Sequence, residues 1–145
     1  SCRIADDKLR GLVQDLETVD EELKNRGFEV THVVNPAPLD LRAMAEEADA
    51  VFMNINVPPR YGTTRFYGKS SFTFWDSFWH EHPATVFTSF GDPYKMYEMP
   101  YVPNMVLAFS NAPSSQRAAV KVWLGEMEAM GKNPVKLDGF FDLQV

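Results

Sequence analysis

The chain has 145 residues, of which 45% are apolar and 13% aromatic, and its formal net charge is -6. A chain of this length forms one domain with roughly two thirds of its unfolded surface buried, and this composition excludes intrinsic disorder. Because the Lys and Arg residues are scattered and outnumbered by acids, we expect no nucleic-acid partner. No apolar run reaches the roughly 18 residues that a membrane span requires, so no membrane association is expected.

The single cysteine, Cys2, excludes an internal disulfide. We therefore expect a cytoplasmic protein, although a secreted parent without disulfides stays open. Residues 1–7 are typical of the end of a truncated first strand. Because an open sheet edge recruits other chains, a homodimer of the isolated domain would be unsurprising.

Strand and helix patterns alternate through the first third of the chain. Apolar positions three and four residues apart predict a helix over residues 7–26, ended by Gly27. A strand over 28–34, a helix over 39–48 and a strand over 50–54 follow. This alternation predicts right-handed crossovers and a parallel sheet.

The stretch 57–69 interrupts this alternation and carries Arg60 and Tyr61 among prolines and glycines. A loop of this length inside a domain is usually functional or mobile. The helix predicted after it, over residues 70–79, places four aromatic residues on one side. We interpret this side as core, with docking to a neighbouring domain as the alternative.

Two apolar runs, over residues 85–89 and 105–109, are predicted to be buried parallel strands because each is rich in β-branched or aromatic residues. A short helix is expected over 92–99. The last helix starts at Pro113, and four of its residues are expected to face inward before Gly131 and Pro134 stop it: Ala119, Val122, Trp123 and Met127.

The fold class that follows is α/β, a three-layer sandwich with a mainly parallel, flavodoxin-like sheet and helices on both of its faces. Residues 1–134 are expected to form the single domain. Residues 135–145 are expected to form a C-terminal tail or an edge strand.

Ligands of open parallel sheets bind beyond the carboxyl ends of the strands. Neutral polar or small residues occupy the predicted ends: Asn54, Asn56, Ser89, Gly91, Ser110 and Asn111. Such side chains suit sugar hydroxyl groups, but they also cap loops and helices, which we favour here. Asp92 is the carboxylate at this edge, and we interpret it as the N-cap of the helix after it rather than as a catalytic acid.

Other chemistries are less well supported. His80 and His82 flank Glu81, but no third ligand is evident nearby, so we expect a surface turn and no metal; no cofactor is expected either. A phosphorelay receiver would need an aspartate at Asn54 and a lysine at Ser110. A cysteine hydrolase would need its thiol near position 90 and not at Cys2.

Two segments carry a resemblance to a known family. Val-Phe-Thr-Ser-Phe-Gly-Asp-Pro-Tyr at 86–94 resembles the strand-turn signature in the C-terminal α/β domain of family 3 glycoside hydrolases, especially the β-N-acetylhexosaminidase branch. Ser-Gln-Arg-Ala-Ala-Val-Lys-Val-Trp-Leu-Gly at 115–125 is similar to that domain's small-residue helix. The resemblance covers most of residues 51–125. It departs at Asp92, where the common form has Asn.

The resemblance implies an accessory domain of a retaining β-glycosidase that cleaves terminal β-linked sugars. The nucleophilic aspartate and the histidine acid/base would lie in an N-terminal (β/α)8 barrel of the same polypeptide, so no catalytic residue is expected in this chain, and its carbohydrate substrate would be that of the parent. The candidates for substrate contact are Asn54, Arg60, Tyr61 and Asp92. The alternative is a free-standing small-ligand or protein-interaction module without activity.

Overall fold

The structure is a computed structural model that describes residues 1–5, 15–34, 38–56, 82–99 and 102–139. The elements in this part of the chain are, in order, β1 (Cys2–Ala5), α1 (Glu17–Asn25), β2 (Val33–Val34), α2 (Pro38–Glu46), β3 (Val51–Asn56), β4 (Thr85–Ser89), α3 (Lys95–Glu98), β5 (Met105–Leu107) and α4 (Pro113–Trp123). Among the described helices, none combines the length and the apolar character needed to cross a membrane.

The strands form one parallel sheet of five strands in the order β2-β1-β3-β4-β5. Cys2 lies opposite Met53 of β3, and Val51 of β3 lies opposite Thr85 of β4. The chain goes from β1 first to one side and then to the other, so the order reverses between β1 and β3. The parallel α/β class predicted from the sequence is therefore confirmed.

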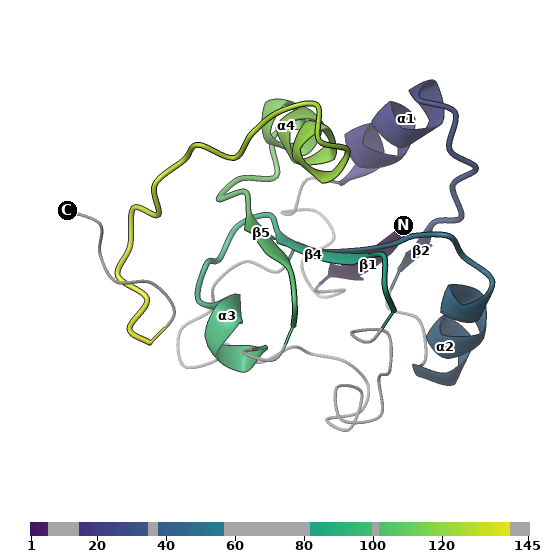
Figure 1. The fold of residues 1–145 in the computed structure, drawn as a ribbon, viewed down its shortest axis with the longest axis horizontal. Helices are drawn as coiled ribbons and strands as arrows, with labels where there is room; N and C mark the ends of the chain where they lie inside the picture. The colour runs from purple at the N-terminus through teal and green to yellow at the C-terminus, as the bar shows by residue number, and fades with distance from the viewer. Residues whose placement is uncertain (6–14, 35–37, 57–81, 100–101, 140–145) are drawn as a thin grey trace.

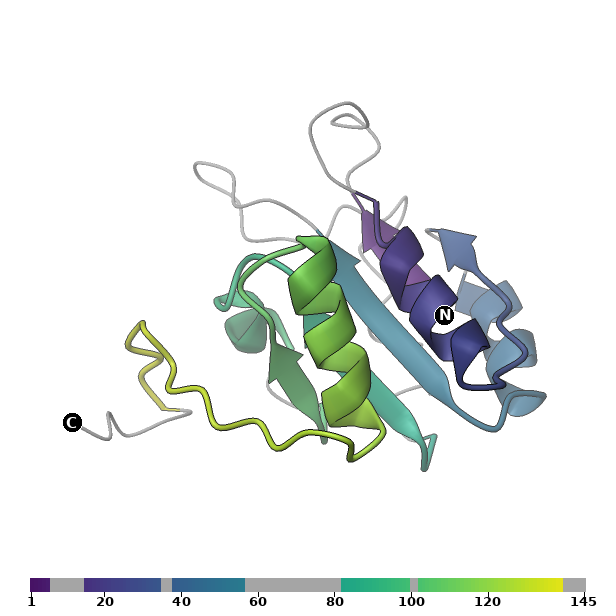
Figure 2. The same cartoon turned by 90° about the horizontal axis from the view of Figure 1, so that it is seen from above.

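Helices lie on both sides of this sheet. Figure 1 shows α1 and α4 above it and α2 and α3 below it. Figure 2, seen from above, shows α1 and α4 running across the near face of the strands. All six residues of β3 are buried, because each face of the strand meets side chains of covering elements.

Alternate residues of β3 supply two apolar cores. Val51, Met53 and Ile55 pack with Leu41 and Ala45 of α2. The other core contains Phe52 of β3 and side chains of α1 and α4: Leu16, Val19, Leu23, Ala119 and Val120. The period of two along a strand thus distributes the apolar run of β3 between the two faces.

The predicted end of the first helix is correct. Gly27 has a φ of 89°, its N–H bonds to the carbonyl of Lys24 at 2.9 Å, and the N–H of Phe28 bonds to that of Leu23 at 3.2 Å. These two bonds form a Schellman motif, which needs a left-handed residue. The predicted helix was too long at its start, because α1 begins at Glu17 and residues 15 and 16 are not helical. Residues 7–14 of the prediction lie outside the described residues.

The predicted end of the last helix is wrong. Gly125, with a φ of 71°, follows α4 directly, and the Glu126 N–H bonds to the Lys121 carbonyl at 2.8 Å in a second Schellman motif. Gly131 and Pro134 therefore lie well beyond the helix, and Met127 is exposed rather than inward. Either glycine suits a helix end, and the helix ends at the earlier one, where contact with the core ends: Leu124 packs on the core, whereas residues 125–130 are exposed.

Two further predictions were too long. The strand predicted over 28–34 is reduced to Val33–Val34, and Phe28 is 37% exposed. The strand predicted over 105–109 ends at Leu107, and Phe109 has a φ of 55° that breaks the extended conformation. The C-terminal tail contains no strand through residue 139, and residues 140–145 lie outside the described part.

Candidate functional site

The carboxyl ends of β3, β4 and β5 lie at one edge of the sheet because the strands are parallel neighbours. Two of the side chains predicted there meet: the Asn111 side-chain amide, after β5, donates to Asn56 Oδ1 at the end of β3, at 3.2 Å. The Ser110 hydroxyl accepts a bond from the Ala112 N–H at 3.1 Å. The neutral edge expected from the sequence is thus present, and these hydroxyl and amide groups bond to the protein itself.

The turn after β4 is closed by its own hydrogen bonds. Ser89 Oγ donates to the Asp92 carbonyl at 2.6 Å, and the Tyr94 N–H donates to Asp92 Oδ1 at 2.9 Å. The prediction that Asp92 caps the following helix is wrong, because Tyr94 is the N-cap of α3. Asp92 instead stabilises the turn before the helix. The residues of the strand-turn signature therefore form one compact unit.

Asp92 also has a buried cationic partner that the sequence analysis missed. Asp92 Oδ2 lies 3.7 Å from Lys95 Nζ, and each side chain is only 2% exposed. A spacing of three residues at a helix start is a signal for such a pair, but the same spacing occurs at many exposed positions. The burial of both side chains makes this pair unusual, because burying a charge is costly even when an oppositely charged group lies beside it.

Asn54 lies within β3, two residues before the end of the strand, and is only 1% exposed. Its side-chain amide donates to Ser1 Oγ at 3.2 Å. Its Oδ1 is buried without a hydrogen-bond partner in the described part of the chain. A buried acceptor without a partner costs about 1–3 kcal/mol of desolvation free energy, so the Asn54 carbonyl destabilises the core.

The remaining candidates cannot be placed from the described residues. Arg60 and Tyr61 belong to the segment 57–81, which follows β3 directly and lies outside that part. The predicted aromatic helix over 70–79, His80 and Glu81 belong to the same segment. The structure therefore brings Asn56 and Asn111 together and closes the turn at Asp92. The roles of Arg60 and Tyr61 in substrate contact stay predictions.

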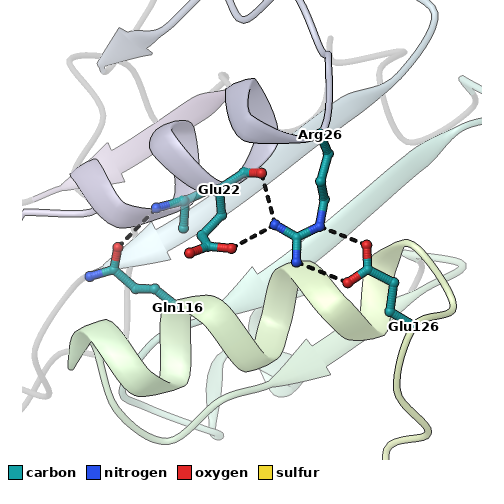
Figure 3. Close-up of polar contacts among 5 residues, drawn as sticks. Glu22, Arg26, Gln116 and Glu126 are labelled. Carbon is teal, nitrogen blue, oxygen red and sulfur yellow. Dashed lines mark hydrogen bonds and ion pairs between the residues drawn. The ribbon is translucent and has the colours of Figure 1, made fainter.

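Gln116 of α4 joins three segments around the site. Its Oε1 accepts the Val19 N–H of α1 at 3.2 Å, and its side-chain amide donates to the carbonyls of Asn111 at 2.7 Å and Asp15 at 3.0 Å. Figure 3 shows this side chain reaching from α4 to the backbone of α1. Gln116 belongs to the second segment of the family resemblance, and here it positions the loop after β5.

A cluster of charges lies between α1 and the end of α4 (Figure 3). The guanidinium of Arg26 makes two parallel bonds to Glu126, at 2.6 and 2.9 Å, and a third to the Glu22 carboxylate at 2.6 Å. The hydrogen bond from Arg26 is the main reason why the pKa of Glu126 lies below its ordinary value. In turn, the hydrogen bond to Glu126 and, to a smaller extent, the one to Glu22 raise the pKa of Arg26. This cluster ties two helices together and lies on the surface.

The histidines of the described part have structural partners. The Ala84 N–H donates to His82 Nδ1 at 3.2 Å, and His82 Nε2 lies 3.1 Å from the Ala48 carbonyl. A neutral ring with its proton on Nε2 satisfies both contacts. His32 pairs with Asp20 of α1 and precedes β2 instead of lying within a strand. Within the described ranges, no group of three His, Cys, Asp or Glu residues is arranged to hold a metal ion.

No family model, curated protein or solved structure matches this chain in the three comparisons made. The chemistry at the strand ends is that of neutral hydroxyl and amide groups, which bind or orient polar groups but do not transfer protons at neutral pH. Asp92, the acidic side chain placed there, is buried and engaged on both oxygens.

Proposed function

We propose that this domain is a non-catalytic scaffold of a retaining β-glycosidase similar to the β-N-acetylhexosaminidase branch of family 3. The observation that carries the proposal is the state of Asp92. A catalytic acid must reach its substrate, whereas this side chain is only 2% exposed and bonds within its own turn. The signature segment is thus suited to holding a turn in shape.

The finer architecture belongs to the same proposal. A strand order of β2-β1-β3-β4-β5 is the order of flavodoxin-like, doubly wound sheets. We therefore assign the domain to a three-layer, flavodoxin-like sandwich, as the family resemblance also implies. In such folds ligands approach the reversal point of the strand order, here between β1 and β3.

In this proposal the domain packs against an N-terminal (β/α)8 barrel that carries both catalytic residues. The segment after β3 supplies a loop to the rim of the sugar site, and Arg60 and Tyr61 are its contacting side chains. Support comes from its place directly after Asn56, at the edge where Asn111 already orders the neighbouring loop. Carbohydrate would then meet this domain only at the border with the barrel.

Hydrolysis of p-nitrophenyl β-N-acetylglucosaminide tests the proposal. We expect activity from the polypeptide that joins this domain to its barrel and no activity from the 145-residue chain alone. Arg60→Ala and Tyr61→Ala in the joined protein should lower kcat/KM by about tenfold, the loss of roughly one hydrogen bond to a sugar. Glu128→Ala, a change at an exposed site after α4, is the matched control and should leave kcat/KM unchanged.

Two results would contradict the proposal. Turnover by the isolated chain, abolished by Asp92→Asn, would make Asp92 catalytic and the scaffold role wrong. A joined protein that is active but insensitive to both loop substitutions would limit the domain to a purely structural role, without a contribution to the sugar site.

A further inference from the structure

The short helix α3 reverses the usual distribution of side chains between core and surface. Lys95 is buried, with its ammonium group 3.7 Å from the Asp92 carboxylate, whereas Tyr94 and Tyr97 are 42% and 47% exposed. A buried charge is costly, and large aromatic side chains gain stability by burial, so each observation is unusual by itself. Here both occur in the same turn, which directs a charge inward and two aromatic rings outward.

The two exposed rings are held in a fixed relation to each other. Their planes are 12° from parallel, and their centroids are 6.5 Å apart. The helix is anchored from inside by Lys95 and by Met99, which belongs to the core on the α2 side. At its start, the Tyr94 N–H bonds to Asp92 Oδ1. An anchored turn thus presents the rings, so a ligand that packs on them requires little further ordering of the protein.

The C-terminal tail adds a pair of charges beside these rings. Leu137 is completely buried and anchors the tail, while its neighbours Lys136 and Asp138 are exposed and lie 2.7 Å apart through Nζ and Oδ1. The hydrogen bond to Asp138 is the main reason why the pKa of Lys136 is raised, and Tyr97 makes a smaller contribution, which places Lys136 near Tyr97. Aromatic rings, an ammonium donor and a carboxylate acceptor therefore lie on one surface.

This combination matches the chemistry of a pyranose sugar. The axial C–H groups of a β-linked glucose-type ring form a flat apolar face that can pack on a tyrosine ring. The rim of the same sugar carries hydroxyl groups, which both donate and accept hydrogen bonds. The Asp138 carboxylate accepts from such hydroxyls, and the Lys136 ammonium donates to them. Apolar surface with a few polar groups that fix orientation is the usual composition of a small-ligand site.

Two other classes of ligand fit this surface less well. Proline-rich peptides also dock on exposed aromatic rings, but their backbone offers mainly carbonyl acceptors, so it provides no donor for the Asp138 carboxylate. Nucleotides and other phosphate-bearing ligands are disfavoured by the same carboxylate and by the net charge of -6. A neutral sugar meets neither obstacle.

We propose that Tyr94, Tyr97, Lys136 and Asp138 form a binding surface for the pyranose units of a neutral, β-linked oligosaccharide. Tyr94 follows the carboxyl end of β4, at the edge of the sheet where the proposed function places the border with the barrel. Sugar units bound here would therefore lengthen the proposed sugar site. That placement rests on the proposed function, whereas binding of the sugar by this domain does not.

Titration of the 145-residue chain with cellotetraose and with tetra-N-acetylchitotetraose tests this proposal. The ring signals of isotope-labelled tyrosines are followed by NMR, and the signals of Tyr94 and Tyr97 are assigned with Tyr94→Phe and Tyr97→Phe. We expect both signals to shift with at least one of the two sugars, with a Kd of about 1–10 mM, as is typical of a small and open contact surface.

Substitutions separate the contributions of ring, hydroxyl and charge. Tyr97→Ala should raise the Kd by about tenfold, because it removes one of the two rings. Tyr97→Phe keeps the ring and should raise it by about threefold or less, and Asp138→Asn should raise it by about threefold because a charged acceptor is lost. Phe28→Leu is the matched control: Phe28 is 37% exposed but precedes β2, at the amino ends of the strands, so its loss should leave the Kd unchanged.

Three results would overturn the proposal. The first is the absence of a shift at both tyrosines with either sugar up to about 20 mM. The second is an unchanged Kd in Tyr97→Ala. The third is tighter binding of a decaproline peptide than of both sugars, which would assign the surface to protein recognition. All these measurements are made without the barrel and without turnover, so their failure leaves the hydrolysis assay of the proposed function standing, and a negative hydrolysis assay leaves them unaffected.

Discussion

Removal of the buried charges at the turn after β4 should reveal strong coupling between Asp92 and Lys95. At their separation of 3.7 Å, two unit charges attract by about 4 kcal/mol if the effective dielectric constant is roughly 20. Desolvation opposes this attraction by several kcal/mol for each ion, so the pair as a whole contributes little. A single substitution, however, leaves one of the two buried charges without this oppositely charged neighbour.

We therefore expect Asp92→Asn and Lys95→Met each to lower the free energy of unfolding by about 3 kcal/mol. The asparagine keeps the acceptor for the Tyr94 N–H, so the loss reports on charge and not on the turn. The double variant should lose only about 0–2 kcal/mol, because it removes both buried charges together. The coupling energy would then be several kcal/mol.

Urea unfolding of the 145-residue chain, followed by tryptophan fluorescence, measures these losses. Asp138→Asn is the matched control: Asp138 lies only 2.7 Å from Lys136 Nζ, but its side chain is 73% exposed, so its removal should change the free energy of unfolding by less than about 1 kcal/mol. If the two single losses simply add in the double variant, the argument from burial is wrong.

Three further substitutions test the packing of α4. Gln116→Ala should lower the free energy of unfolding by about 2–3 kcal/mol in urea, because it removes three hydrogen bonds, from the Val19 N–H and to the carbonyls of Asn111 and Asp15. Trp123→Phe keeps an aromatic ring beside the β3 phenylalanine on which the indole stacks at 4.8 Å, but it removes the indole N–H that donates to Thr88 Oγ1, so a loss of about 1 kcal/mol is expected by the same assay. Glu126→Gln should lower the Tm at pH 7, and since the pKa of Glu126 is held below its ordinary value of 4.5 by Arg26, the difference from the unsubstituted chain should be complete above pH 4.5 and vanish as the pH falls through the folded-state pKa. A Tm difference that persists in acid would exclude the Arg26 pair as its cause.

The scaffold proposal and the free-standing module differ in what the strand ends must do. A binding module needs polar groups that are available to a ligand, whereas Asn56, Asn111 and Ser110 already bond to neighbouring atoms of the chain. These hydrogen bonds fix the loops at the strand ends, which suits a domain that holds loops in place for a larger assembly. The hydrolysis assay with and without the barrel separates the two.

The sequence alone determined the class of fold and most of the strands. The apolar runs over 50–54 and 85–89 predicted β3 and β4 because a strand covered on both faces cannot alternate with polar residues. Gly27 and Pro113 marked a helix end and a helix start, since each acts through its own backbone conformation. These signals are local, because each depends on the backbone conformation of its own residue and not on the segment that packs beside it.

Tertiary structure alone decided the partners of the polar side chains and the true length of several elements. Arg26 meets Glu126, and Gln116 meets the carbonyl of Asp15, across about a hundred residues of chain. The choice of Gly125 over Gly131 and the shortening of β2 likewise depend on which segments pack beside them. Hydrophobic periodicity records which face of an element is buried, but it does not record which distant segment covers that face. For that reason the burial of the Asp92 and Lys95 pair became visible only in the folded chain.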